Sequence, residues 1–220
     1  MSDGSNIDVA MYREEMGEFP SLRYPADRHL HMLNWLTRLS RDAGCQPPIL
    51  VGCGAVELFT DAQTATGDVD IIAPDAVKLG STLVSLGFQR SSDHRFWFHP
   101  AHSVLFEFPS DKLRPGERTV TLDLDGIECF IISPEDLIVD RLEAYEASGS
   151  GTDLVYAYLV YHGLYDQLDH DRLNGSVESA DLKRIHSFLS ELHDKAANKG
   201  LSVDEQGAQL TKEIRSGRSG

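Results

Sequence analysis

The alternation of hydrophobic and polar positions predicts a chain built from both helices and strands. Apolar residues recur three and four positions apart over residues 26–43 and 75–86, which is typical of amphipathic helices, and a short helix is expected over 55–62. The dipeptide Asp125-Gly126 lies between two apolar runs and is a strong β-hairpin signal. Short aliphatic or aromatic runs between polar breaks predict strands at residues 49–51, 68–72, 95–99, 103–108, 119–124 and 127–132.

From residue 133 onward the pattern is helical. The segment Ser-Pro-Glu-Asp at 133–136 opens a helix, because serine suits the N-cap, proline the first helical position and acids the positive helix end. This helix is expected to end near Ala147, before a flexible Ser-Gly break at 148–151, and helices over 153–164 and 179–195 follow. The predicted domains are a mobile lead-in over residues 1–25, an α/β domain over 26–132, a helical region over 133–196 and a polar tail over 197–220.

Composition and charge limit the class of protein. The chain has 220 residues, of which 41% are hydrophobic and 25% charged, so it can bury a core as a soluble globular protein does. No apolar run approaches the roughly 18 residues of a membrane span, and the acidic N-terminus lacks the features of a signal peptide, so we expect a cytoplasmic protein without a membrane partner. The net charge of −15 argues against broad non-specific nucleic-acid binding, although a local basic patch is compatible with it.

The cysteines give no sign of a structural cross-link or a zinc site. Cys45, Cys53 and Cys129 are odd in number and show no Cys-x-x-Cys spacing. We therefore expect neither a disulfide framework nor a zinc centre.

The strongest candidate for chemistry lies in residues 49–72, which predict a strand, a glycine turn, a helix and a second strand. Glycines such as Gly52 and Gly54 at a strand-to-helix turn let backbone N–H groups approach an anion, and the helix N-terminus adds a partial positive charge. Asp68 and Asp70 are two positions apart on the second strand and so project from the same face. Two carboxylates this close repel each other unless a cation lies between them, which predicts a divalent metal such as Mg²⁺ or Mn²⁺.

The same residues resemble the signature of the polymerase-beta-like nucleotidyltransferase superfamily, in particular the bacterial branch that includes AbiEii-type toxins and related small nucleotidyltransferases. The matching residues are Gly52, Ala55, Glu57, Leu58, Thr66, Asp68 and Asp70. Cys53 stands where the family has glycine or serine, and a thiol is a weaker hydrogen-bond donor than a hydroxyl. The resemblance is strong over residues 49–75 and weaker as far as 159. It implies a mixed sheet flanked by helices in an α/β (α+β) core, followed by a C-terminal helical region.

A two-metal transfer site uses a third carboxylate from a neighbouring strand, and Glu107 is the first candidate. Its strand is otherwise apolar, and a lone acid in such a strand is costly to bury without a partner. Asp123 is the competing candidate, although it leads directly into the Asp125-Gly126 turn, where acids are common for local reasons.

The resemblance also implies roles for other residues and for the substrate. A nucleoside triphosphate (NTP) would be the substrate, and Asp68, Asp70 and Glu107 would be the catalytic and metal-binding residues. The predicted nucleotide-binding residues are Gly52, Cys53, Gly54, Thr66 and Arg141.

Three functional hypotheses follow. The first is a metal-dependent nucleotidyltransferase that transfers a nucleoside monophosphate (NMP) to a hydroxyl of an RNA such as tRNA or of a protein, in the setting of a toxin–antitoxin pair with an antitoxin protein as partner. The second is a catalytically inactive nucleotidyltransferase fold with a binding or regulatory role. A glycosyltransferase with an Asp-x-Asp motif is disfavoured, because by resemblance a large nucleotide-sugar-binding half precedes that motif, and only 67 residues precede Asp68.

Overall fold

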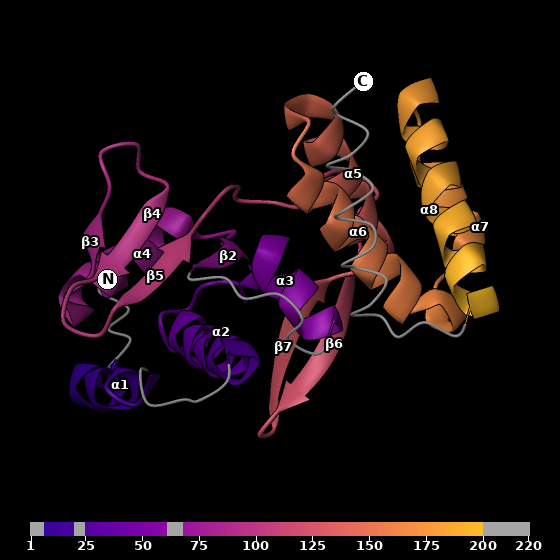
Figure 1. Ribbon diagram of the computed structural model, residues 1–220. Coiled ribbons are helices and arrows are strands. Elements are labelled where there is room, and N and C mark those ends of the chain that lie inside the picture. The colour runs from indigo at the N-terminus through magenta and orange to yellow at the C-terminus, as the bar shows by residue number, and fades with distance from the viewer. Residues whose placement is uncertain (1–6, 20–24, 61–67, 200–220) are drawn as a thin grey trace. The chain divides into compact units, whose positions relative to one another are not determined.

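The computed structural model describes residues 7–19, 25–60 and 68–199, and these form two compact units (Figure 1). The first unit includes the described residues up to Leu58 and those from Asp68 to Ile132, and the second begins at Ser133 and also takes in Phe59 and Thr60. Among the described helices, none combines the length and the hydrophobicity that a membrane crossing requires.

The first unit contains a seven-stranded mixed sheet with the strand order β3-β4-β5-β2-β1-β7-β6. The pairs β2–β5 and β1–β7 are parallel, and the other neighbours are antiparallel. The strands are β1 (Ile49–Leu50), β2 (Val69–Ile72), β3 (Gln89–Arg90), β4 (Phe96–His99), β5 (Val104–Glu107), β6 (Thr119–Leu124) and β7 (Ile127–Ile132). The helices are α1 (Val9–Met16), α2 (Pro25–Asp42), α3 (Gly52–Phe59) and α4 (Ala76–Leu86). The predicted α/β class with a mixed sheet is therefore confirmed.

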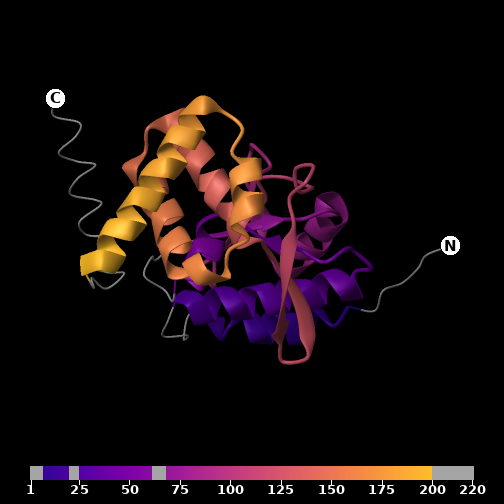
Figure 2. The same cartoon turned by 90° about the vertical axis from the view of Figure 1, so that its right-hand side faces the viewer.

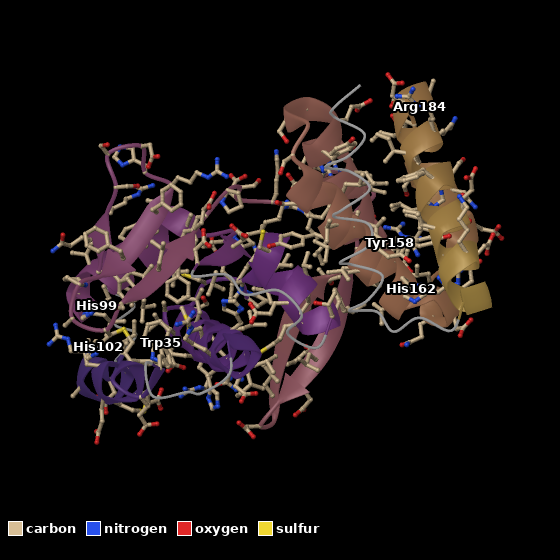
Figure 3. All side chains as sticks on the ribbon, in the orientation of Figure 1. Trp35, His99, His102, Tyr158, His162 and Arg184 are labelled. Atoms are coloured by element: carbon tan, nitrogen blue, oxygen red, sulfur yellow. The ribbon has the colours of Figure 1, made fainter. Side chains whose placement is uncertain are left out.

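The indole of Trp35, on α2, lies at the centre of the first unit's core (Figure 3). It meets Tyr12 edge-on with ring centroids 5.6 Å apart and stacks on Phe106 of β5 at 6.3 Å. Its Nε1–H donates to the backbone carbonyl of Tyr12 over 3.1 Å, which satisfies the polar atom that a buried tryptophan carries. Because successive strand residues point to opposite faces, anchoring Phe106 in this core directs the neighbouring Glu107 to the other face of the sheet.

The hairpin between β6 and β7 forms as its sequence predicts. Asp125 and Gly126 have positive φ angles of 55° and 77°, the conformation that a two-residue hairpin turn of this type requires. The Gly126 N–H donates to Asp123 Oδ1 over 2.9 Å, so the Asp123 carboxylate stabilises the turn.

The prediction of a lead-in without regular structure is wrong for residues 9–16, which form α1. Asp8 caps this helix by accepting a hydrogen bond from the Met11 N–H at 3.0 Å, and Tyr12 and Met16 are fully buried. The Tyr12 hydroxyl donates to Asp42 of α2 over 2.7 Å. Four of the apolar residues of this helix are consecutive, at positions 9–12, so the spacing of three and four residues that predicts an amphipathic helix is not distinct in this segment.

The second unit is helical, with α5 and α6 packed as neighbours and α8 against both (Figure 2). Its elements are α5 (Pro134–Ser148), α6 (Gly151–Gly163), the 3₁₀ helix η2 (Tyr165–Gln167), α7 (His170–Ser176) and α8 (Ala180–Lys199). Ser133 caps α5 as predicted, with its Oγ accepting from the Asp136 N–H at 3.2 Å. The expected flexible break is a tight connection, because Gly149 ends α5 with a φ of 67° and α6 begins at Gly151. Residues 197–199 of the predicted tail belong to α8, and the tail from residue 200 onward lies outside the described residues.

Aromatic and histidine side chains fill the interior between α6, η2 and α8. Tyr158 stacks on His162 with ring centroids 5.6 Å apart (Figure 3), and Tyr165 stacks on His193 at 3.6 Å. The Nδ1 atoms of His162 and His193 are 2.6 Å apart, so the Nδ1–H of one ring donates a hydrogen bond and the Nδ1 of the other ring accepts it. Burial lowers the pKa of both imidazoles, and His193 further lowers that of His162.

Candidate metal centre

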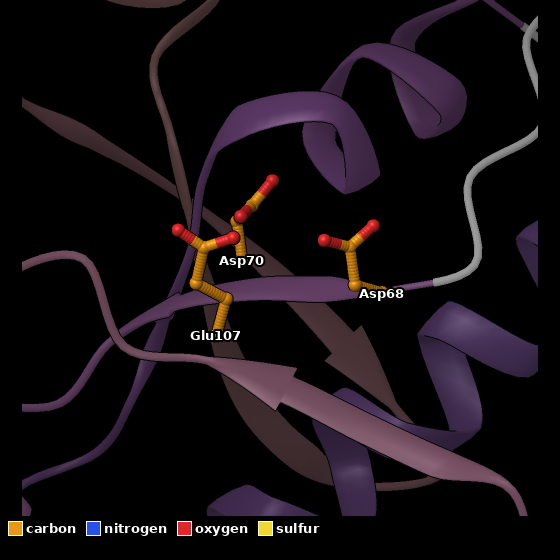
Figure 4. A group of neighbouring side chains, drawn as sticks. All are labelled: Asp68, Asp70 and Glu107. Carbon is orange, nitrogen blue, oxygen red and sulfur yellow. The ribbon is translucent and has the colours of Figure 1, made fainter. Parts of the chain in front are cut away.

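Three carboxylates meet on one face of the sheet (Figure 4). Asp68, Asp70 and Glu107 each offer an oxygen, and these oxygens all lie within 4.8 Å of one another. Asp68 immediately precedes β2, Asp70 lies within it, and Glu107 ends the neighbouring parallel strand β5. Within the described residues this is the single group of three or more potential metal ligands.

Strand alternation explains why the three side chains converge. On β2, Val69 is buried in the core, so Asp68 and Asp70 on either side of it project from the opposite face. The parallel register pairs Val69 with Phe106 and Asp70 with Glu107. Val69 and Phe106 therefore lie on the core face, and Asp70 and Glu107 lie side by side on the other.

The donor set fits a hard divalent cation. It consists of carboxylate oxygens alone, which are the ligands that Mg²⁺ and Mn²⁺ prefer. Three acids this close repel one another in the absence of a cation, and Glu107 is also buried. The three residues could therefore hold a divalent metal ion, and Glu107 rather than Asp123 supplies the third carboxylate of the group.

Arg95 also contacts this group, and its participation was not predicted. Its guanidinium forms an ion pair with Glu107, whose side chain is 11% exposed, whereas that of Arg95 is 54% exposed. Arg95 lies one position before β4, and its carbonyl accepts a hydrogen bond from the Phe108 N–H at 2.9 Å. No sequence pattern links Arg95 to Glu107, because the pair depends on the antiparallel register of β4 and β5.

The glycine turn predicted to bind phosphate packs directly on Asp70. Gly52 has a φ of +57°, and a Cβ added to it would lie 2.6 Å from Cγ of Asp70. The Cys53 N–H donates to Asp70 Oδ2 over 3.0 Å, and the Val51 N–H donates to the Asp70 carbonyl, also over 3.0 Å. The turn thus fixes the Asp70 carboxylate of this group at the start of α3.

A buried pair of ionisable groups lies behind the turn. His29 Nδ1 is 3.0 Å from Glu57 Oε2, and both side chains are fully buried. Burial is the main cause that lowers the pKa of His29 to about 4, Arg28 lowers it further, and Asp68 acts in the opposite direction. The lowered pKa favours the neutral form of His29 near pH 7. Glu57 belongs to the sequence signature, but its partner on α2 could not be recognised from the sequence.

The remaining predicted site residues are placed as follows. Thr66 lies outside the described residues. Arg141 is on α5 in the second unit, where its guanidinium donates to Asp140 at 2.6 Å and to Asp153 at 3.1 Å. Its predicted contact with nucleotide phosphates stays a prediction.

The fold around this group of carboxylates is similar to that of a nucleotidyltransferase-like protein of known structure. A crystal structure of an antigenic nucleotidyltransferase-like protein from Paracoccidioides brasiliensis is similar, with a TM-score of 0.59 over 80% of this chain and 93% of that chain. The sequences are 16% identical, so the likeness shows the fold. No protein-family model matches the chain, and no curated protein matches it significantly.

Proposed function

We propose that this protein is a metal-dependent nucleotidyltransferase that transfers NMP from an NTP to a hydroxyl acceptor. The observation that carries the proposal is the convergence of Asp68, Asp70 and Glu107 beside the glycine turn at Gly52. In the reaction, a bond forms between the acceptor oxygen and the α-phosphorus. The bond from that phosphorus to the pyrophosphate oxygen breaks, and the acceptor hydroxyl loses its proton.

Each part of the site has a defined task in this reaction. Divalent ions held by Asp68, Asp70 and Glu107 would lower the pKa of the acceptor hydroxyl and neutralise charge on the departing pyrophosphate. Asp70 is held in place by the backbone N–H of Cys53 and by its strand partners, so its carboxylate is oriented before substrate arrives. The N-terminus of α3, which begins at Gly52, adds a partial positive charge that favours phosphate at this edge of the sheet.

The acceptor and the biological setting follow from the sequence resemblance alone. We propose a cytoplasmic enzyme that modifies a hydroxyl of an RNA such as tRNA or of a protein, as the toxin of a toxin–antitoxin pair. The net charge of −15 disfavours an acceptor held by a broad phosphate-binding surface. A folded RNA recognised at a local patch or a protein hydroxyl is compatible with that charge, and so is a basic antitoxin.

The direct test uses the double variant Asp68→Asn/Asp70→Asn. Wild-type protein is incubated with each labelled NTP, Mg²⁺ or Mn²⁺, and either total RNA or a protein extract, and transfer of label is measured. We expect loss of labelling in the double variant and retention of a native circular-dichroism spectrum. Asp125→Asn is the matched control, because it removes a carboxylate from the same unit but at the hairpin turn. Undiminished labelling by the double variant would refute the proposal.

A second candidate function is a catalytically inactive protein of the nucleotidyltransferase fold with a binding or regulatory role. Two observations favour it: the thiol of Cys53 stands where the family has glycine or serine, and the ion pair from Arg95 occupies Glu107. Calorimetry of the protein with NTP and Mg²⁺, followed by analysis of the nucleotide, separates the two candidates. Binding with release of pyrophosphate supports the enzyme, whereas binding of intact nucleotide in the presence of the acceptor pools supports the regulatory function.

A further inference from the structure

We propose that Arg95 is a nucleotide-binding residue that exchanges partners during the catalytic cycle. It neutralises Glu107 while the carboxylate group holds no metal, and it binds a phosphate of the nucleotide once metal has taken Glu107. This inference rests on the proposed function. It adds a residue and a sequence of events to that function, and neither the sequence signature nor the fold assigns them.

The backbone of Arg95 is fixed while its side chain is able to move. The Phe108 N–H donates to the Arg95 carbonyl over 2.9 Å, and the next residue, Phe96, is the direct strand partner of Glu107. These contacts place the Cα of Arg95 beside the carboxylate group. The side chain itself is 54% exposed, so it can rotate toward solvent or toward a ligand without disturbing the core.

Electrostatics favour the ion pair in the metal-free protein. Three carboxylates with oxygens within 4.8 Å of one another repel, and Glu107 is the most buried of the three. A guanidinium on Glu107 relieves this repulsion without adding a ligand. The ion pair with Glu107 is therefore the favourable contact for the Arg95 guanidinium, because it joins opposite charges through a charge-assisted hydrogen bond.

The same electrostatics reverse when a divalent cation is bound. The guanidinium of Arg95 and a bound metal ion are both positive, so they repel each other when both contact the Glu107 carboxylate. Metal binding and the Arg95 ion pair therefore compete. The displaced guanidinium remains beside the group of carboxylates, where the proposed function would place the nucleotide phosphates. Its planar set of N–H donors matches two phosphate oxygens, which makes phosphate its most favourable new partner.

This exchange predicts effects of opposite sign in two binding measurements on Arg95→Gln. In the first, Mn²⁺ alone is titrated and free Mn²⁺ is followed by electron paramagnetic resonance. Loss of the competing positive charge should tighten Mn²⁺ binding about 3- to 10-fold, as expected for a unit charge removed near a partly solvated site. In the second, the non-hydrolysable α,β-methylene analogues of the four NTPs are titrated in turn at saturating Mn²⁺. There the variant should bind the preferred analogue about 5- to 50-fold more weakly, as for loss of a charge-assisted phosphate contact.

Arg90→Gln is the matched control. Arg90 is on β3 of the same group of strands, but its guanidinium lies over the ring of Trp97 at 5.1 Å and its Nε donates to the His94 carbonyl at 3.1 Å. Its removal should leave both affinities within twofold of wild type. Arg95→Lys keeps the charge but not the planar donor set, so it should retain wild-type Mn²⁺ affinity and show an intermediate loss of nucleotide affinity.

The outcomes separate this inference from the proposed function. If wild type binds Mn²⁺ and Asp70→Asn does not, the metal site stands. Unchanged or weakened Mn²⁺ binding in Arg95→Gln, or unchanged analogue binding, then overturns the exchange alone. If wild type binds no Mn²⁺, or Asp70→Asn binds it equally well, the metal site fails and the role of Arg95 fails with it.

Discussion

Gly52 lies against Asp70 so closely that no side chain fits between them. A Cβ on Gly52 would lie 2.6 Å from the Asp70 Cγ, well inside van der Waals contact. The positive φ of +57° at Gly52 is a second reason for glycine at this position. The glycine of the signature therefore determines the position of the Asp70 carboxylate, the proposed metal ligand, as well as the shape of the proposed phosphate site.

Gly52→Ala should reduce both stability and metal binding. The left-handed backbone alone costs about 1 kcal/mol for alanine, and the clash with Asp70 must add to that or displace the carboxylate. We expect a free energy of unfolding lower by about 2–4 kcal/mol in urea titrations and at least a tenfold loss of Mn²⁺ affinity. Gly126→Ala is the control, because φ is +77° there but no atom lies within 4 Å of an added Cβ. It should lose stability while keeping Mn²⁺ affinity, and equal Mn²⁺ affinities in the two variants would contradict the steric argument.

The two candidates for the third carboxylate can be separated by paired variants. Glu107→Gln removes a charge from the group of three acids and should weaken Mn²⁺ binding tenfold or more, with a corresponding loss of transfer activity. Asp123→Asn keeps the oxygen that accepts from the Gly126 N–H and should leave both quantities near wild type. A greater metal-affinity loss in Asp123→Asn than in Glu107→Gln would reverse the assignment.

His29 should make the first unit sensitive to acid. Its pKa is lowered to about 4 in the folded protein, mainly by burial, and lies near 6.5 in an unfolded chain. The unfolded state therefore binds the extra proton first, and stability falls as the pH drops from about 6.5 towards 4, by up to about 3 kcal/mol. Urea unfolding of wild type and His29→Gln at pH 7.5 and pH 5 measures this. The variant should lose less stability on acidification, and an identical loss would show that His29 titrates normally.

The pair of His162 and His193 should make α8 sensitive to acid in the same direction. Burial is the main cause that lowers the pKa of both rings, while Asp166 and Asp194 partly oppose the effect at His193. Below about pH 6.5 the unfolded segment takes up protons that the packed pair resists, so α8 loses stability as the pH falls. Hydrogen exchange of α8 amides at pH 7.5 and 5.5, corrected for intrinsic rates, should show reduced protection at the lower pH. His193→Gln should reduce this difference and His31→Gln, in the first unit, should not.

Local patterns predicted six of the described strands and the acidic pair, but not the two-residue strand β3 (Gln89–Arg90). The runs at 119–124 and 127–132 are strands β6 and β7 with those bounds, because alternation and the Asp125-Gly126 turn are properties of adjacent residues. The same alternation placed Asp68 and Asp70 on one face. It was compatible with Glu107 as the third carboxylate. Choosing Glu107 over Asp123 required the register of β2 with β5, which pairs Asp70 with Glu107.

The features that sequence reasoning missed depend on contacts between distant segments. Tyr12 and Met16 anchor helix α1 in a core whose other side chains, such as Trp35, come from later in the chain. The ion pair of Arg95 and the burial of His29 against Glu57 likewise arise from strand pairing and helix packing. Such contacts have no period or spacing in the sequence, so tertiary structure was required to find them.

The pairing of Asp70 with Glu107 makes the group of three carboxylates depend on the register between strands β2 and β5. Side chains on a strand alternate between its two faces, so a shift of β5 by one residue against β2 would turn Glu107 into the apolar interior and bring Phe106 out. A misaligned molecule could retain most of its helices and still lack one ligand. Stoichiometric Mn²⁺ uptake would therefore measure the fraction of a preparation in which these two strands are correctly aligned, which a spectrum of secondary structure cannot distinguish.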